Sequence, residues 1–256
     1  MQWSASGERQ VPAGDAWLTP FEAVRAGGMR FTKRRTEYRL RRFAGKRAVA
    51  AVLGMPDHDP HALARIAVLN RRTGAPFVQV DGTDLSLDVS LTDRAGWAVC
   101  LVGPDLGAVG CDLEMVEARS EGFVSDFLTP DEQSLVRDAT GAGGDARDAA
   151  ANLIWSAKES ALKVLRTGLR ADTRTVEVTF GGATPSTAAA GAWHQLAVAT
   201  RLGELPGWWR RDGVFLLTVV AADPAALGAP PEVLPGSADL AVAEPLHSWL
   251  TNPLAE

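Results

Sequence analysis

Apolar and polar residues recur with two different periods along the chain, which predicts a mixture of helices and strands. Helical spacing is clearest over residues 35–53 and 149–166, and we expect a long helix at each place. Shorter helices are expected to begin at Thr19-Pro20 and at Thr129-Pro130, because each pair is followed by a glutamate at the third helical position. Another short helix is expected near 120–127.

Short apolar runs bounded by turn residues predict strands. We expect them at 64–70, 76–80, 85–89, 97–102, 109–116, 175–180, 193–201 and 214–222. Residues 1–16 are expected to be irregular, and the Gly- and Pro-containing segment 103–108 is the best candidate for a boundary. The element order after it repeats the order before it. We therefore expect two halves, 1–105 and 106–225, followed by a peripheral tail, 226–256.

Composition places the chain among ordinary globular proteins, with 46% hydrophobic and 22% charged residues. No apolar run approaches the roughly 20 residues that a membrane helix needs. The first residues lack the basic and apolar regions of a secretion signal. Cys100 and Cys111 lie in apolar surroundings and are expected to be reduced. We expect a cytoplasmic protein without a membrane partner.

A net charge of -5 conceals a basic stretch, since nine of the residues from Arg30 to Arg47 are Lys or Arg and one, Glu37, is acidic. Such a stretch can bind nucleic acid, form a solvated helix face, or line a pocket for a small, multiply charged anion. Aromatic residues for base stacking are sparse here and the rest of the chain is acidic. This combination favours a small anion, and we expect no nucleic-acid partner.

Two carboxylates follow one another closely in the predicted strand 109–116. Side chains alternate between the faces of a strand, so Asp112 and Glu114 share a face, about 7 Å apart at their Cα atoms. Both could bind one divalent cation, for which carboxylate oxygens are suitable ligands. The alternative is an edge strand with a solvated acidic face, which for this pair alone is the more common situation.

The predicted helix 149–166 adds a second charged pair. Glu159 and Lys163 lie one turn apart, on a face turned away from the apolar stripe that includes Ala157 and Ala161. An exposed helix pair of this kind is common and contributes only a few tenths of a kcal/mol. Trp155, one turn earlier on the same face, instead indicates that this face covers a neighbour or a cleft.

Together these two segments resemble the signatures of phosphopantetheinyl transferases of the broad-specificity, Sfp-like class. The segments are Val109-Gly110-Cys111-Asp112-Leu113-Glu114 and Trp155-Ser156-Ala157-Lys158-Glu159-Ser160-Ala161-Leu162-Lys163. A weaker likeness extends over about residues 17 to 222. The resemblance implies an α+β fold of two similar α/β halves related by a pseudo-twofold, with the active site at their interface. It also implies a monomer.

The implied reaction moves 4'-phosphopantetheine from coenzyme A to a serine of an apo acyl, peptidyl or aryl carrier protein. It releases 3',5'-ADP and depends on Mg²⁺, with Mn²⁺ as a substitute. Such carriers serve fatty acid, polyketide and nonribosomal peptide biosynthesis. By resemblance, Asp112, Glu114 and Glu159 would hold the metal, and Glu159 would take the serine proton, directly or through a metal-bound water. Lys163, helped by Lys158, would neutralise charge at the phosphates.

The resemblance also implies a coenzyme site in the first half. Arg42 and Lys46 match the family's cationic helix and would contact the 3'-phosphate. Gly74 and Pro76 match a Gly-Lys-Pro turn near the adenine, although Ala75 replaces its lysine. The family's Asn-x-Ser-His motif falls on Ser90-Leu91-Thr92-Asp93, which puts Thr92 and Asp93 at the coenzyme. An aspartate thus stands where the family has a phosphate-binding histidine, and Arg94 is a candidate replacement cation.

Two other functions use the same residues. A Mg²⁺-dependent phosphohydrolase or nuclease could employ the three carboxylates without any carrier protein. An inactive, coenzyme A-binding homologue is the other alternative, and Ala75 and Asp93 are the features that favour it.

Overall fold

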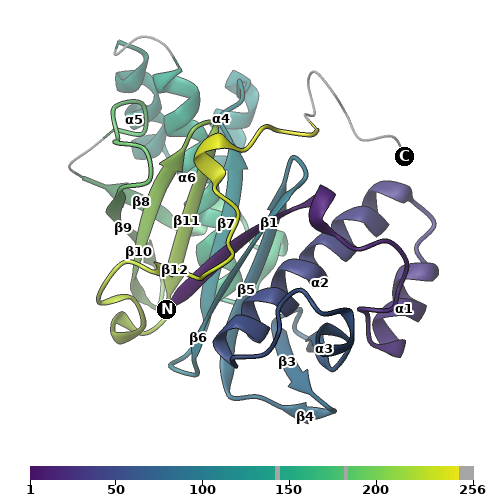
Figure 1. The fold of residues 1–256 in the computed structure, drawn as a ribbon. Helices are drawn as coiled ribbons and strands as arrows, with labels where there is room; N and C mark the ends of the chain where they lie inside the picture. The colour runs from purple at the N-terminus through teal and green to yellow at the C-terminus, as the bar shows by residue number, and fades with distance from the viewer. Residues whose placement is uncertain (142–144, 182–183, 248–256) are drawn as a thin grey trace. The chain divides into compact units, whose positions relative to one another are not determined.

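The computed structural model describes residues 1–141, 145–181 and 184–247 and shows a mixed α/β architecture (Figure 1). By its internal contacts the chain divides into two compact units. Unit 1 contains Met1–Asp105, Pro231–Asp239 and Ala243–Glu256, and unit 2 contains Leu106–Pro230 and Leu240–Val242. The part of the expected tail beyond residue 247 lies outside the described residues.

Unit 1 contains a sheet in the order β12-β1-β6-β5 and a small sheet in the order β2-β3-β4. The strands are β1 (Gln2–Gly7), β2 (Ile66–Asn70), β3 (Pro76–Val80), β4 (Thr83–Asp84), β5 (Leu87–Arg94), β6 (Trp97–Pro104) and β12 (Glu232–Val233). The helices are α1 (Pro20–Gly27), α2 (Thr32–Val52) and α3 (Pro60–Ala64). Helix α2 is the expected basic helix, and it buries Phe43 and Val49 in a core with Trp17 and Ile66.

The first strand was not expected from the sequence. Trp3 and Ala5 are buried in β1, but Ser4 and Ser6, on the opposite face, are buried as well. Burial on both faces removes the apolar-polar alternation by which a strand is usually detected. The expectation of an irregular segment over 1–16 was therefore wrong for this part.

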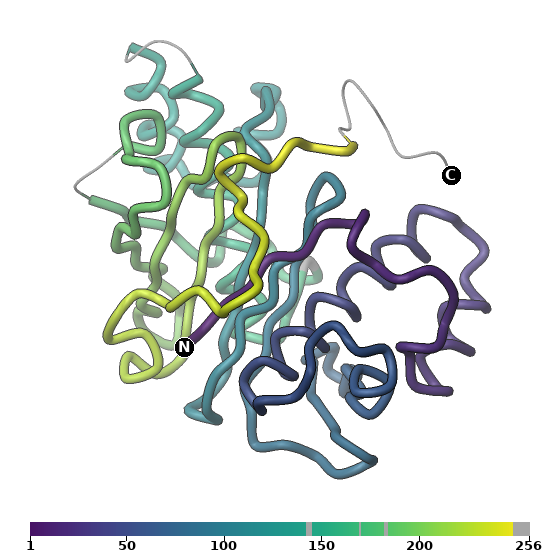
Figure 2. The backbone as a smooth tube through the Cα atoms, in the orientation of Figure 1, coloured from purple at the N-terminus to yellow at the C-terminus, as the bar shows by residue number. Residues whose placement is uncertain are grey.

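The start of the C-terminal tail joins unit 1, as the tube in Figure 2 shows where the yellow chain runs along the purple β1. Strand β12 pairs in parallel with β1, and the Leu234 amide donates to the Trp3 carbonyl at 2.8 Å. Leu234 itself is 4% exposed and belongs to the unit 1 core. We expected residues 226–256 to be peripheral, whereas this stretch is part of the fold.

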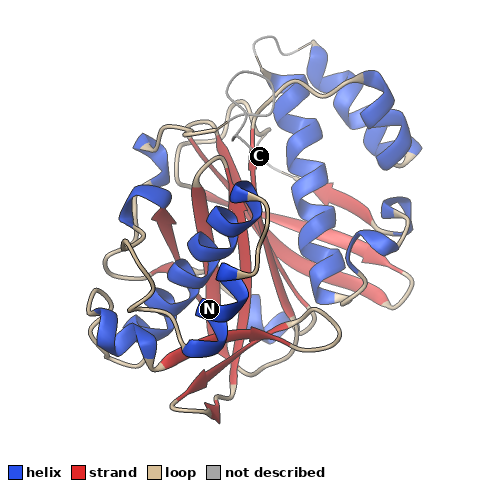
Figure 3. Cartoon of the chain, turned by 90° about the vertical axis from the view of Figure 1, so that its right-hand side faces the viewer, coloured by secondary structure: helices blue, strands red, loops and turns tan. Residues whose placement is uncertain are grey.

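Unit 2 is built on a sheet in the order β7-β11-β10-β9-β8, with helices on it (Figure 3). The strands are β7 (Val109–Met115), β8 (Glu177–Phe180), β9 (Trp193–Thr200), β10 (Gly203–Asp212) and β11 (Phe215–Ala221), and the helices are α4 (Glu121–Phe127), α5 (Pro130–Thr140) and α6 (Ala146–Val164). All the strands expected for this half are confirmed, and β10 is additional.

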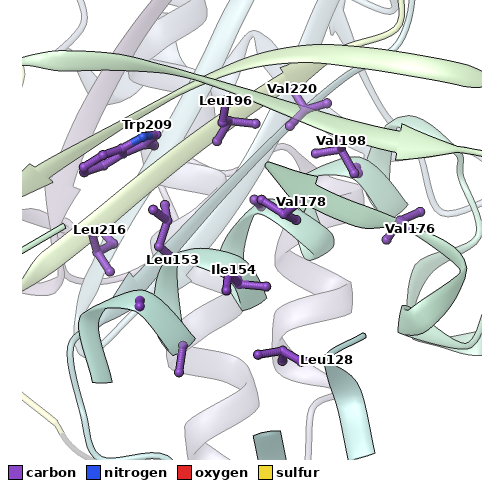
Figure 4. Packing of buried hydrophobic residues seen from close by; sticks show 14 of the residues in the cluster. Leu128, Leu153, Ile154, Val176, Val178, Leu196, Val198, Trp209, Leu216 and Val220 are labelled. Carbon is purple, nitrogen blue, oxygen red and sulfur yellow. The ribbon is translucent and has the colours of Figure 1, made fainter. Parts of the chain in front are cut away.

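The core of unit 2 lies between α6 and the sheet. Figure 4 shows Leu153 and Ile154 of α6 facing Val178, Leu196 and other apolar side chains of the strands. The expected apolar stripe of this helix is confirmed, because Ala157 and Ala161 are fully buried in the same cluster. The helix is thereby fixed with one face on the sheet.

A buried ion pair ties the first capping box to the rest of unit 1. Thr19 caps α1, and Glu22 returns its carboxylate to the Thr19 amide, as the sequence predicts. Glu22 also accepts from the Val68 amide at 3.0 Å and pairs with Lys46 Nζ at 2.7 Å. The Glu22 and Lys46 side chains have no exposed surface, so the pair lies wholly inside the unit.

Unit 2 repeats this arrangement. Thr129 caps α5, and Glu132 accepts from the Thr129 amide and from the Val178 amide, each at 2.8 Å. Its partner is Lys158 of α6, whose Nζ lies 2.8 Å from Glu132 Oε2 and is likewise fully buried. The two units therefore use the same internal connection between a helix cap, a long helix and a strand.

Two further expectations concern membranes and thiols. None of the helices that the structure describes has the length and apolar character required to cross a bilayer. Cys100 and Cys111 are both buried thiols.

Candidate functional site

The Asp112 and Glu114 carboxylates lie on β7, but they do not form a solvated acidic face. Asp112 is 4% and Glu114 8% exposed. Gly110, two residues before Asp112, lies so close to α6 that an added Cβ atom would be 2.0 Å from the Ser160 carbonyl oxygen. Because side chains alternate along a strand, Gly110, Asp112 and Glu114 all face α6.

Helix α6 brings its own charged residues to this face of β7. Lys163 donates to Asp112 Oδ1 at 2.9 Å and to the Cys111 carbonyl at 2.6 Å. Glu159, one turn earlier, is only partly exposed and interacts electrostatically with Asp112, Glu114 and Lys163. The structure therefore gathers Asp112, Glu114, Glu159 and Lys163 in one place in unit 2.

Arg119 belongs to this group, although the sequence analysis did not identify it. Its guanidinium nitrogen lies 3.2 Å from Glu114 Oε2. Its Nε donates to the Asn152 side-chain oxygen at 2.7 Å, which holds the guanidinium on α6. Arg119 lies in the segment between β7 and α4 and outside both signatures, so only its position five residues after Glu114 could have pointed to it.

The concentration of carboxylates raises the proton affinity of Glu159. Burial and then the negative charge of Asp112 raise the pKa of Glu159 to about 8, against the lowering effect of Lys163. For Lys163, burial alone would lower the pKa, but the charge of Asp112 outweighs it and the pKa is raised. At neutral pH Lys163 therefore stays charged, beside a glutamic acid that mostly retains its proton.

Oxygen donors of this kind suit a hard divalent cation. The part of the chain that the structure describes contains no group of three or more His, Cys, Asp or Glu side chains already placed to hold a metal. Lys163 and Arg119 now occupy positions beside Asp112 and Glu114. The donor chemistry of these carboxylates thus fits Mg²⁺.

Two lysines expected at the phosphates are placed elsewhere. Lys158 donates to the Thr173 and Val176 carbonyls at 2.9 and 2.6 Å, besides its pair with Glu132. Lys46 is enclosed in the same way in unit 1. Neither ammonium group is exposed, so neither can contact a phosphate in this structure. The reason is that each must neutralise the buried carboxylate of a capping box.

A candidate anion site in unit 1 involves Arg42. This residue is 6% exposed and donates to the Val68 carbonyl at 2.6 Å and to Asn70 Oδ1 at 2.9 Å. Asn70 in turn donates to the Gly74 carbonyl at 2.8 Å, so Arg42 is linked to the turn that precedes Pro76. Gly74 has φ +91°, a conformation that favours glycine.

A pocket of about 250 Å³ opens beside these residues. Its lining combines cationic and aromatic side chains, namely Phe21, Arg25, Tyr38, Arg42 and Phe77, with Val68, Leu69 and Asn70. The Arg42 guanidinium lies 4.8 Å from the centroid of the Tyr38 ring. Such a lining suits a small ligand that carries a negative charge and an aromatic ring.

Thr92 and Asp93 are adjacent residues of β5. Thr92 is buried, and Asp93 forms an ion pair with Arg41 of α2. Arg41 is the partner that the structure gives to this aspartate. The negative charge of Asp93 is therefore paired within unit 1.

Trp155 is 8% exposed and does cover a neighbour, as its place on the charged face indicated. Its ring packs edge-on against Phe123 and Phe127, with centroids 5.1 and 5.3 Å away. The Arg119 guanidinium lies over Phe123, at 4.6 Å from its centroid. The aromatic group thus supports the arginine that pairs with Glu114.

No curated protein matches the chain. A family model does match, over residues 108–203 of the chain. This segment includes β7, Arg119, α5 and α6 in full. Over this segment, which carries the charged side chains described above, the chain is similar to the 4'-phosphopantetheinyl transferase superfamily.

Proposed function

We propose that this protein transfers 4'-phosphopantetheine from coenzyme A to a serine hydroxyl of an apo carrier protein, with Mg²⁺ as its metal. The observation that carries the proposal is the Asp112–Lys163 ion pair beside Glu159, in the segment similar to the transferase superfamily. Phosphoryl transfer depends mainly on positioning and on charge stabilisation, and this group of residues can supply both.

In the proposed reaction the serine oxygen attacks the phosphorus that bears the pantetheine arm. A new phosphorus-oxygen bond forms to serine, and the bond to the leaving phosphate of 3',5'-ADP breaks. Glu159 accepts the serine proton, and the Lys163 ammonium stabilises negative charge on the phosphate oxygens. Lys163 is suited to this role because its raised pKa keeps it charged.

Glu159 can act as a base only after it has lost its own proton. With a pKa of about 8, most of it is protonated at neutral pH when no cation is bound. Asp112, Glu114 and Glu159 are the residues that would hold Mg²⁺. When bound, the ion would supply positive charge to the pyrophosphate and would favour the ionised form of Glu159.

Unit 1 would bind the nucleotide end of coenzyme A. Arg42, the Gly74 turn and the pocket beside Tyr38 supply charge, backbone and an aromatic surface for it. Arg41 pairs with Asp93, so the aspartate at this position need not repel the phosphates of the coenzyme. The repeated capping-box ion pair supports the expectation of two similar halves, and we retain the expectations of a monomer and of the cytoplasm.

The test is to incubate the protein with coenzyme A, Mg²⁺ and an apo carrier protein, and to measure the intact mass of the carrier. We expect one phosphopantetheine addition, lost with a chelator, with Asp112→Ala or with Glu159→Gln. Glu121→Gln is the matched control, because Glu121 is an exposed carboxylate paired with Arg147 outside this group.

Absence of any addition on acyl, peptidyl and aryl carriers would refute the proposed function. Activity of Glu159→Gln at the parent rate would refute only its role as the base. Release of phosphate or nucleotide without a carrier would instead indicate the hydrolytic alternative.

A further inference from the structure

A group of hydroxyl side chains lies between α6 and the sheet of unit 2. Thr218 of β11 stands opposite Asp112 in the β7–β11 pairing and is fully buried. Its hydroxyl oxygen lies 2.9 Å from that of Ser156 and 2.8 Å from that of Ser160. A single threonine thus contacts two successive turns of the helix that carries Glu159.

The same serines also reach the backbone of the strands. Ser156 Oγ lies within hydrogen-bond distance of the Asp112 carbonyl, at 3.1 Å, and Ser160 Oγ of the Thr218 carbonyl, at 3.3 Å. Each hydroxyl has one hydrogen to donate and can accept others. The three hydroxyls and two carbonyls therefore form a small, fully buried network that involves both β7 and β11.

This network lies on the functional face of α6. Residues 156, 159, 160 and 163 are spaced by three and four, so they follow one another along the same side of the helix. Ser156 and Ser160 contact the strands by hydrogen bonds, and Lys163 does so at Cys111. Glu159 lies between these contacts, and its position relative to Asp112 depends on them.

Apolar packing alone would position α6 less well at this point. Gly110 and Ser160 are in close contact, and small residues bury little apolar surface. Apolar contacts also have no preferred direction, whereas hydrogen bonds do. A helix held on β7 only by small apolar side chains could shift along the strand at little cost.

We propose that Thr218 is a positioning residue of the active site. Its hydroxyl, with those of Ser156 and Ser160, sets the position of α6 along β7, and so the placement of Glu159 and Lys163 against Asp112. Thr218 itself touches neither substrate nor metal. This inference rests on the proposed function for its kinetic consequence, but the geometry it describes is independent of it.

The main variant is Thr218→Val, which preserves the shape of the side chain and removes the hydroxyl. Thr218→Ser restores the hydroxyl and serves as the rescue. Thr173→Val is the matched control, because Thr173 is also buried in unit 2 but donates to the Phe127 carbonyl, outside this network. Ser156→Ala removes a second member of the network in case the valine variant folds poorly.

Steady-state kinetics should separate positioning from general loss of structure. We expect Thr218→Val to lower kcat about tenfold or more, since a misplacement of about 1 Å can cost about a hundredfold. KM for coenzyme A should change less than kcat, because the nucleotide end of coenzyme A is assigned to unit 1 and not to α6. Thr218→Ser should recover kcat to within about threefold of the parent, and Thr173→Val should leave kcat unchanged.

A second measurement does not require activity. Mn²⁺ is titrated into each variant, and free Mn²⁺ is followed by electron paramagnetic resonance. We expect weaker Mn²⁺ binding in Thr218→Val and Ser156→Ala, and parent-like binding in Thr218→Ser and Thr173→Val. If the parent protein modifies no carrier but this pattern holds, the proposed function fails and the positioning inference stands.

The inference is overturned if Thr218→Val retains both the parent kcat and the parent Mn²⁺ affinity. It is equally overturned if Thr173→Val loses as much as Thr218→Val, because a general loss of stability then explains both. A parent protein that neither modifies a carrier nor binds Mn²⁺ refutes the function and the positioning together.

Discussion

Gly110, the glycine of the first signature, lies where α6 packs closely on β7. The backbone of α6 passes so close to β7 that no side chain fits there. We expect Gly110→Ala to destabilise the protein by about 1–3 kcal/mol, as overpacking usually does, and to lower activity by displacing Lys163 and Glu159. Urea denaturation and the carrier assay would measure the two effects.

Gly122→Ala is the control for this substitution. Gly122 lies in α4, where the nearest atom to an added Cβ is 3.8 Å away. Alanine is the better helix former by up to about 1 kcal/mol, so this variant should be as stable as the parent or more so. Equal effects of the two substitutions would contradict the close approach of α6 to β7.

Glu159 should make stability depend on pH. Its pKa is raised to about 8 by burial and by Asp112, whereas an unfolded glutamate titrates near 4.5. Between these values the folded state binds more protons than the unfolded state, so the free energy of unfolding falls as pH rises. The loss of stability caused by ionising Glu159 is absent below its pKa in the unfolded state. It is complete above its pKa in the folded state.

We therefore expect the difference in stability between Glu159→Gln and the parent to grow in favour of the variant from pH 5 to pH 8. The slope can reach about 1.4 kcal/mol per pH unit. Denaturant titrations in a chelator, so that no divalent cation masks the effect, would measure it. A difference independent of pH would show that Glu159 is already ionised at pH 5.

Among the elements, α2 and α6 each contain a lysine that serves the fold. Burial lowers the pKa of both Lys46 and Lys158, and the glutamate of a capping box opposes this in each case. Removal of one partner of a buried pair leaves an uncompensated charge, which costs about 3–5 kcal/mol. We expect Lys158→Met and Lys46→Met to lower the free energy of unfolding by similar amounts in this range.

The comparison of the two lysines is itself the control. If Lys158 were needed only at the phosphates, its methionine variant would keep full stability and lose only turnover. Lys46→Met, in the other unit, would then be the only one of the two variants with a lowered free energy of unfolding. Calorimetry on both variants distinguishes these outcomes without reference to activity.

These elements also show what the sequence could and could not predict. The Thr-Pro-x-Glu segments predict the starts of α1 and α5 correctly, because a capping box depends on local residues alone. The role of Lys158 in packing could not be predicted, since it depends on Glu132, 26 positions earlier, and on the Thr173 carbonyl. Thr218 was expected only as part of a strand, because its contacts are made across the sheet.

At the scale of the whole molecule, the same internal connection occurs once in each unit. In unit 1 a cap glutamate contacts Lys46 and the Val68 amide, and in unit 2 Glu132 contacts Lys158 and the Val178 amide. Each glutamate lies 46 positions before the amide that it accepts from. Both units thus fix a long helix on their own sheet by the same chemistry.

The chain also returns to its first unit at Pro231–Asp239, and this return should contribute to stability. Leu234 is buried in the unit 1 core, Ser237 Oγ accepts from the Ala5 amide at 2.9 Å, and Arg47 donates to the Gly236 carbonyl at 2.9 Å. We expect Leu234→Ala to cost about 2–5 kcal/mol, the usual effect of truncating a buried leucine. Thermal and urea unfolding would measure it.

Val233→Ala provides the matched comparison one position earlier. Val233 is 57% exposed on β12, so its truncation should change stability by no more than about 0.5 kcal/mol. A small effect of both substitutions would show that residues 231–239 are dispensable for unit 1, as the sequence alone suggested. A large effect of Leu234→Ala alone would show that unit 1 needs residues 231–239, because its core is then built from residues that precede and follow 106–230.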